Sequence, residues 1–210
     1  MTHYRDALPQ LGPELFLTDS GLETDLIYNH DVDLPHFASF PLLDDAAGAR
    51  RLRSYFADHA AIAARADVGF LLESVTWRAN ADWGVLLGYS TDALDQVNRK
   101  AVDLLVEVRA EWAVTRRPYP ISGCVGPRDD GYAPAMLMTA EATRAYHRAP
   151  DLHVRGHPGA DLITAMTLAY PDEAIGIAQA ARDVEMPVVL SFTLETDGNL
   201  PDGSTLAAAI

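Results

Sequence analysis

The chain of 210 residues has one cysteine, Cys124, one lysine, Lys100, and no long run of apolar residues. A single cysteine excludes an internal disulfide and any metal site built from several cysteines of this chain. A membrane-spanning helix needs about 20 consecutive apolar residues, and no stretch approaches that length. The first residues do not combine a basic segment with a following apolar one, so we expect no secretory signal and a cytoplasmic location.

Positive charge is also scarce. The chain has 16 Lys and Arg residues against 30 Asp and Glu residues, which gives a net charge of −14 at pH 7. Nucleic acids and anionic membrane surfaces both attract basic proteins, so we expect neither as a partner. Hydrophobic residues make up 49% of the chain and charged residues 22%, which is typical of a soluble globular protein. We therefore expect a single domain over residues 1–210, and the oligomeric state stays open.

Short apolar runs alternate with segments of helical periodicity along the whole chain. Strands are expected at residues 14–18, 68–72, 120–125, 162–166 and 187–192. Helices are expected at residues 46–66, 94–112, 139–147, 171–184 and 205–210. This alternation is typical of a parallel sheet covered by helices, either a barrel or a doubly wound sheet. The chain has neither the glycine-rich dinucleotide motif after its first strand nor a phosphate-binding loop, which favours the barrel.

Polar side chains gather where the predicted strands end. These residues are Asp19 and Glu23, then Glu73, Ser74 and Thr76, then Ser122 and Cys124, then Thr164 and Thr167, and finally Ser191, Thr193 and Glu195. In a barrel of parallel strands the carboxyl ends form the active-site face. We expect Trp77 and Trp83 to pack beneath the rim of that face. We interpret His59 and His147 as ordinary helix residues.

Four blocks of sequence lie at or just after the predicted strands: TDSGLETDL at residues 18–26, ESVTWRAN at 73–80, SGCVGP at 122–127 and SFTLETDGNLPDG at 191–203. These blocks resemble motifs of the homocysteine S-methyltransferase family. The blocks occur in the order and at the spacing of that family, which makes the combined resemblance strong. It implies a fold of the (β/α)8 TIM-barrel type, here incomplete, with about five βα units in this chain.

The resemblance also implies an activity. Members of the family transfer a methyl group from a donor such as S-methylmethionine to the thiol of homocysteine, which gives methionine. A zinc ion held by three cysteine thiolates binds that thiol and deprotonates it. The partners implied are therefore a small-molecule thiol and a methyl donor. The residues that the resemblance places at the substrate are Asp19, Ser20, Gly21, Glu73, Thr76 and Ser191.

This chain departs from the family pattern in two ways that affect function. The zinc cysteines of the family follow strands six and eight, whereas this chain ends at Ile210, just past the fifth predicted strand, and Cys124 is not at a ligand position. We therefore expect no metal ligands in this chain and two unpaired sheet edges. Met166 stands where many members have a glutamate that helps to hold the substrate amino group. A thioether is a poor substitute for that glutamate, so the acceptor thiol stays open.

Two alternatives to methyl transfer remain from the sequence. The chain could be a truncated or degenerate member of the family without catalysis, because it lacks the zinc site. Asp19, Glu73 and Glu195 could instead form a carboxylate cluster for metal-free hydrolysis, which requires two carboxyl groups within about 10 Å.

A separate hypothesis concerns residues 148–158, where proline and glycine interrupt an expected helix. We interpret this segment as a compensated reading-frame slip in the coding sequence.

Overall fold

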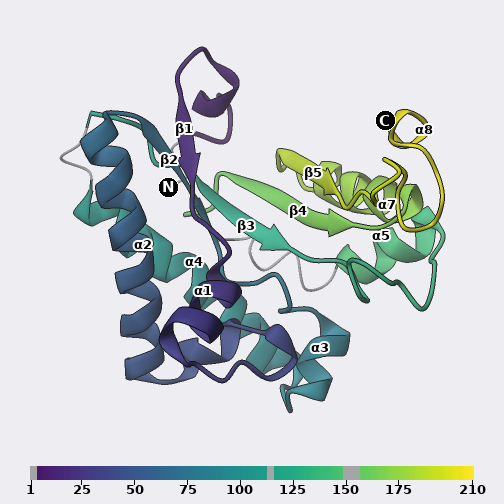
Figure 1. The fold of residues 1–210 in the computed structure, drawn as a ribbon, viewed down its shortest axis with the longest axis horizontal. Coiled ribbons are helices and arrows are strands. Elements are labelled where there is room, and N and C mark those ends of the chain that lie inside the picture. The colour runs from purple at the N-terminus through teal and green to yellow at the C-terminus, as the bar shows by residue number, and fades with distance from the viewer. Residues whose placement is uncertain (1–3, 113–115, 149–156) are drawn as a thin grey trace.

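The computed structural model describes residues 4–112, 116–148 and 157–210, and its core is one parallel sheet (Figure 1). The strands are β1 (Phe16–Thr18), β2 (Gly69–Glu73), β3 (Ile121–Val125), β4 (Leu162–Leu168) and β5 (Val188–Phe192). They are hydrogen-bonded in the order β1-β2-β3-β4-β5, and every neighbouring pair is parallel. The sheet curls into a half-barrel with helices between its strands. The expected incomplete barrel is therefore confirmed, with β1 and β5 at its two edges.

The helices fall between the strands as the periodicity predicts. They are α1 (Leu22–His30), α2 (Ala46–Ala66), α3 (Ala81–Leu86), α4 (Thr91–Glu111), α5 (Ala140–Arg148), α7 (Pro171–Arg182) and α8 (Leu206–Ala209), with 3-10 turns at Pro9–Leu11, Pro35–Phe37 and Phe40–Asp44. Every predicted strand and helix is present, with its ends shifted by three residues at most. The short helices α1 and α3 were not predicted. The segment that we interpret as a reading-frame slip, residues 148–158, consists mainly of residues 149–156, which lie outside the described residues.

The two longest helices begin at side-chain caps. The Asp45 carboxylate accepts hydrogen bonds from the backbone N–H groups of Ala47 and Gly48 at the start of α2. The Ser90 hydroxyl accepts one from the Ala93 N–H at the start of α4. Such caps satisfy amide groups that the helix itself leaves without partners, which fixes where each helix begins.

The core lies between the helices and the central strands. Phe56 of α2, Phe70 and Leu72 of β2, Leu105 of α4 and Ile121 of β3 are all fully buried. Every residue of β3 is buried, whereas β5 is mostly half-buried and exposes Val189. The central strands are therefore the most buried part of the sheet, and burial decreases toward the β5 edge. None of the helices in the described residues is long and apolar enough to cross a membrane.

An ion pair fastens the amino ends of the central strands. Arg109 of α4 donates to the carboxylate of Asp161 at 2.8 Å, and the Asp161 side chain is fully buried. The same carboxylate accepts a hydrogen bond from the Ile121 N–H at 3.0 Å, at the start of β3. This contact lies at the end of the sheet opposite the polar rim, where barrel residues generally serve stability.

Gly176 allows α5 and α7 to pack closely. A methyl group at this position would lie 2.5 Å from the Cβ of Thr143 and 2.6 Å from the carbonyl oxygen of Ala140. We expect Gly176→Ala to lower the free energy of unfolding by about 1–3 kcal/mol, because the α5 backbone has to move. Urea unfolding followed by circular dichroism measures this. The control is Gly84→Ala in α3, where the nearest atoms are the mobile tip of Leu94 at 3.2 Å. Equal losses in the two variants would contradict the prediction.

Candidate functional site

Glu73 is the centre of the polar rim at the carboxyl ends of the strands. It is the last residue of β2, and only 7% of its surface is exposed. Its Oε1 accepts a hydrogen bond from the Thr164 hydroxyl at 2.8 Å, and the Thr164 and Ser122 hydroxyls lie 2.7 Å apart. Its Oε2 is buried and has no hydrogen-bond partner among the described residues. An unpartnered buried oxygen is costly, so it marks a place where a ligand can bind.

Burial also changes the protonation of this carboxyl group. Loss of hydration raises the pKa of Glu73 to about 7, and the nearby Asp19 adds to the rise. The Thr164 and Ser122 hydroxyls act in the opposite direction by stabilising the charged form. Glu73 therefore exchanges its proton close to neutral pH.

Asp19 follows β1 and forms the second carboxyl group of the rim. It is half-buried, and burial raises its pKa to about 6. Attraction to His59 and a hydrogen bond from Tyr55 oppose that rise, with the Tyr55 hydroxyl 3.3 Å from Asp19 Oδ2. Both Asp19 and Glu73 thus hold protons more tightly than exposed carboxyl groups do. Two such groups at one rim are typical of a functional site.

Thr76 serves the architecture of the rim through its hydroxyl. This hydroxyl donates to the carbonyl oxygen of Cys124 at 2.6 Å and lies 2.6 Å from the Ser74 hydroxyl. The Ser74 hydroxyl in turn accepts a hydrogen bond from the Cys124 N–H at 2.8 Å. These bonds form a ring that ties the segment after β2 to β3. The predicted substrate role of Thr76 stays a prediction.

Cys124 is buried beneath the carboxyl groups. Burial raises the pKa of its thiol well above the ordinary value, and the negative charges of Glu73, Glu23 and Asp19 add to the effect. The thiol is therefore protonated at neutral pH and is no candidate for a nucleophile.

The remaining predicted site residues lie at the two edges of the sheet. Ser20 and Gly21 link β1 to α1, and Gly21 is the N-cap residue of that helix. Ser191 is half-buried in β5, at the far side of the rim. Glu195 is exposed in a turn after β5, where its N–H donates to the Asn199 carbonyl oxygen at 2.8 Å. The structure thus couples Asp19 with Glu73, while Glu195 takes part in a surface turn.

Met166 and Thr167 lie at an irregularity in β4. The pairing of β4 with β5 shifts register between Ala165 and Leu168, and Thr167 has a φ of 58°. This backbone region is unfavourable for a β-branched residue, and such strain is concentrated near functional sites. The Thr167 hydroxyl accepts a hydrogen bond from Trp77 Nε1 at 3.0 Å. The irregularity thus joins β4 to the tryptophan that follows β2.

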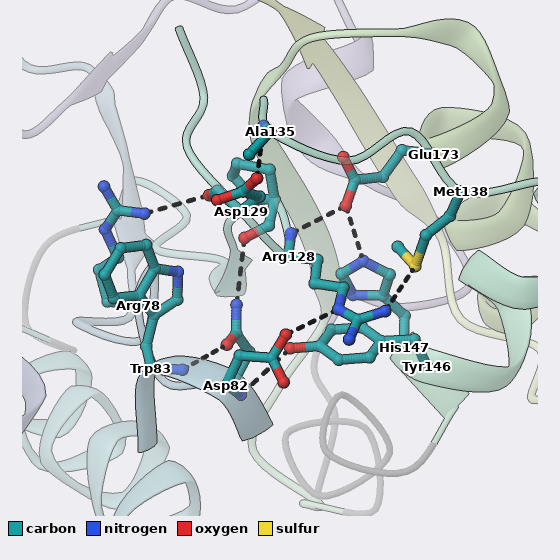
Figure 2. Close-up of polar contacts among 12 residues, drawn as sticks. Arg78, Asp82, Trp83, Arg128, Asp129, Ala135, Met138, Tyr146, His147 and Glu173 are labelled. Atoms are coloured by element: carbon teal, nitrogen blue, oxygen red, sulfur yellow. Dashed lines mark hydrogen bonds and ion pairs between the residues drawn. The ribbon is translucent and has the colours of Figure 1, made fainter. Parts of the chain in front are cut away.

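Trp77 and Trp83 enclose the side chain of Arg78. The guanidinium carbon lies 4.2 Å from the centre of the Trp77 ring and 4.0 Å from that of Trp83. Arg78 Nη1 also donates to the backbone oxygen of Asp129 at 3.2 Å, as Figure 2 shows. Burial lowers the pKa of Arg78, although Asp130 and other acidic neighbours oppose this. The two indoles therefore pack around a cation, where the sequence predicted only that they pack beneath the rim.

A second polar network anchors the segment after β3 (Figure 2). The Glu173 carboxylate at the start of α7 accepts a hydrogen bond from the Arg128 N–H at 2.8 Å and lies 3.2 Å from His147 Nε2. The side chains of Glu173 and His147 are both almost fully buried. The Arg128 side chain reaches the Asp82 carboxylate at 2.7 Å. His147 is therefore a buried member of a network, which differs from the ordinary helix residue that the sequence suggested.

The zinc ion that the family resemblance implies needs several donor side chains close together. No group of three or more His, Cys, Asp or Glu side chains in residues 4–112, 116–148 and 157–210 could hold a metal ion. The cysteine, Cys124, is buried and protonated, so it is a poor ligand for zinc. The described residues therefore do not fit the zinc site of the family.

Sequence reasoning missed Tyr55 and His59 as parts of this site. Both lie on α2 and reach the segment after β1, where the Ser20 hydroxyl lies 3.2 Å from the Tyr55 hydroxyl and 3.0 Å from His59 Nε2. Their spacing of four residues puts them on one face of the helix, and this was the available signal. Tyr55 fits the apolar pattern of α2, so the sequence predicted it as a core residue and gave no indication that its hydroxyl forms hydrogen bonds at the site.

The fold and its rim define a β/α-barrel type of protein with ionisable groups gathered at the carboxyl ends of the strands. The family model for homocysteine S-methyltransferase matches residues 16–210, and the chain belongs to this family. A comparison with curated proteins finds no match.

Solved structures of the homocysteine methyltransferase MmuM from Escherichia coli share the fold. The oxidized form has a TM-score of 0.74 at 20% identity, over 97% of this chain and 70% of that chain. The metallated form has a TM-score of 0.71 at 18% identity, over 97% and 71%. The apo form has a TM-score of 0.66 at 21% identity, over 96% and 68%.

Proposed function

We propose that this chain binds homocysteine or a related thiol amino acid at its rim and transfers a methyl group to the thiol. Membership of the family supports the reaction type. The observation that carries the proposal is the buried, unpartnered Oε2 of Glu73 beside Asp19. A substrate ammonium group supplies the donor that this oxygen lacks. It also stabilises the charged forms of both carboxyl groups, whose pKa values burial has raised.

The other predicted residues fit this arrangement by their positions. Ser20 and Gly21 precede α1, where backbone N–H groups at a helix N-terminus suit the substrate carboxylate. Ser191 offers a hydroxyl from β5, and Met166 leaves that part of the rim apolar. Glu73 and Asp19 thereby compensate for the missing glutamate at position 166. We propose S-methylmethionine as the donor and methionine as the product.

Zinc supplies a thiolate in the family mechanism, and the E. coli protein is known in a metallated form. Since the described residues do not fit such an ion, we assign no step to it. This same observation favours a second candidate function, in which the chain binds the thiol amino acid without transferring a methyl group. In both cases we propose one domain over residues 1–210 that acts in the cytoplasm on small molecules.

Binding of L-homocysteine tests the role of Asp19. We expect Asp19→Asn to weaken binding about 10- to 100-fold, because a hydrogen bond to a charged group contributes about 1.5–3 kcal/mol. Isothermal titration calorimetry of the 210-residue chain at pH 8 measures the dissociation constant. The matched control is Asp33→Asn, at an exposed aspartate that follows α1.

A substrate analogue without the amino group separates recognition from general affinity. We expect 4-mercaptobutanoate to bind the wild type more weakly than homocysteine does. We also expect Asp19→Asn to weaken the binding of 4-mercaptobutanoate less than it weakens the binding of homocysteine. Equal binding of both compounds to the wild type would contradict the proposed role of the two carboxyl groups. Methionine formation from S-methylmethionine, followed by mass spectrometry, then distinguishes methyl transfer from binding alone.

A further inference from the structure

The contact between the Ser20 hydroxyl and His59 is one that the proposed methyl transfer does not use, since that proposal relies only on the backbone position of Ser20 before α1. The Ser20 hydroxyl is exposed, and its Oγ lies 3.0 Å from His59 Nε2. His59 Nδ1 lies 2.9 Å from the backbone oxygen of Tyr55, one helical turn earlier in α2. A carbonyl oxygen only accepts hydrogen bonds, so Nδ1 carries the proton of the neutral ring. His59 Nε2 is therefore the acceptor that faces the serine hydroxyl.

The neighbouring groups leave this acceptor available to the Ser20 proton. The Tyr55 hydroxyl donates to the Ser20 carbonyl oxygen at 2.9 Å or to Asp19 Oδ2 at 3.3 Å, so its proton has an acceptor other than Ser20 Oγ in either case. The Ser20 hydroxyl could donate to the Tyr55 oxygen at 3.2 Å, but the imidazole nitrogen is closer and more basic. The Asp19 carboxylate and a protonated His59 attract each other. The surroundings thus favour transfer of the proton from serine to histidine.

A groove beside His59 has room for a small molecule, and the Ser20 side chain is itself exposed to solvent. It has a volume of about 410 Å³ and lies between α1 and α2, where Tyr55, His59 and Ser54 contribute to its lining. Helix α1 begins at Leu22, one residue beyond the N-cap Gly21 that follows Ser20, and no side chain caps its start in the part of the chain that the structure describes. The positive end of this helix dipole favours negative charge that develops next to Ser20. The hydrogen bond between Ser20 and His59 and the groove beside His59 do not involve Glu73, which carries the proposed methyl transfer.

We propose that Ser20 is a nucleophile and His59 its general base in the hydrolysis of small carboxylic esters. Ser20 Oγ bonds to the ester carbonyl carbon as its proton passes to His59 Nε2. The bond between that carbon and the alcohol oxygen then breaks, and the alcohol leaves with the proton from His59. Water attacks the acyl-serine, gives its proton to His59, and releases the acid while Ser20 regains its proton. One ester and one water give one acid and one alcohol.

Labelling of the 210-residue chain with diisopropyl fluorophosphate tests the nucleophile directly. We expect one diisopropylphosphoryl group per chain, which fragmentation in the mass spectrometer places on Ser20. We expect His59→Gln to slow labelling about 100-fold or more, because general base catalysis typically contributes that much. The same variant should slow p-nitrophenol release from p-nitrophenyl acetate to a similar extent.

Ser54→Ala is the matched control, because Ser54 is an exposed serine that lines the same groove. We expect this variant to be labelled at the wild-type rate and Ser20→Ala not to be labelled. Circular dichroism establishes that the variants are folded, and the position of the label in the wild type does not depend on any variant. A label absent from the wild type, a label on another residue, or unchanged labelling of folded His59→Gln would overturn the proposal. None of these outcomes depends on homocysteine binding or methyl transfer.

Discussion

Replacement of Glu173 with alanine is expected to lower the free energy of unfolding by about 3 kcal/mol or more. The Glu173 carboxylate is buried, and it accepts from the Arg128 N–H while facing His147 Nε2 at 3.2 Å. Removing the carboxylate takes the acceptor away from the Arg128 N–H and removes a polar neighbour of His147, and buried polar groups that lose a hydrogen-bond partner are costly. Urea unfolding, followed by circular dichroism and tryptophan fluorescence, measures the loss.

The adjacent Asp172 provides a matched control for this change. It is also an acidic residue in the first turn of α7, but it is exposed. We expect Asp172→Ala to cost less than about 1 kcal/mol, which is the scale of a charge at a helix N-terminus. Glu173→Gln should give an intermediate loss, because the amide oxygen still accepts from Arg128. Similar losses for Glu173→Ala and Asp172→Ala would show that the buried network contributes little.

Glu73→Gln is expected to make the protein more stable at alkaline pH and to leave it unchanged in acid. The pKa of Glu73 is raised from 4.5 to about 7 in the folded state, so the folded state binds the proton more tightly than the unfolded chain. The resulting stability is fully present below pH 4.5 and is lost as the pH rises toward 7. Over the whole pH range, the protonation of Glu73 changes the free energy of unfolding by roughly 3 kcal/mol. About 2 kcal/mol of this change occurs between pH 5.5 and 8.5.

Urea unfolding of wild type and variant at pH 5.5 and 8.5 measures this difference. We expect the advantage of Glu73→Gln over the wild type to grow by about 2 kcal/mol between the two pH values. Glutamine also accepts from the Thr164 hydroxyl, so the comparison isolates the ionisation. Glu195→Gln at the exposed turn after β5 should show no such change with pH. An advantage that is the same at both pH values would contradict the raised pKa of Glu73.

Much of the fold could be predicted from periodicity alone. The apolar runs at β2 and β3 and the helical spacing in α2 and α4 produce buried elements close to the predicted positions. Helix α1 was missed because only Leu22 and Leu26 of its nine residues are buried, which is too weak a pattern to identify. The arrangement of the strands as a half-barrel followed from the resemblance, since alternation alone also fits a doubly wound sheet.

The candidate site was predictable in its residue types but only partly in its contacts. Asp19 and Glu73 could be found because carboxyl groups at strand ends share one rim in a parallel sheet. Thr76 and Cys124, which are in contact, lie 48 positions apart in the sequence. His147 and Glu173 lie 26 positions apart. No local pattern encodes such pairs, because tertiary packing brings them together. For the same reason the pairing of Ser20 with His59, 39 positions apart, was invisible until the fold placed α2 beside the first loop.

The order of the strands has a consequence for how the chain acquires its structure. Each strand from β2 to β5 is paired with the strand that precedes it in the sequence. During synthesis on a ribosome, every new strand therefore finds its neighbour already made. Each docking step closes a loop of about one βα unit, whose entropic cost grows only slowly with its length. Stepwise growth from β1 is thus compatible with this topology, and at every intermediate stage the most recent strand forms an open edge of the sheet in addition to β1.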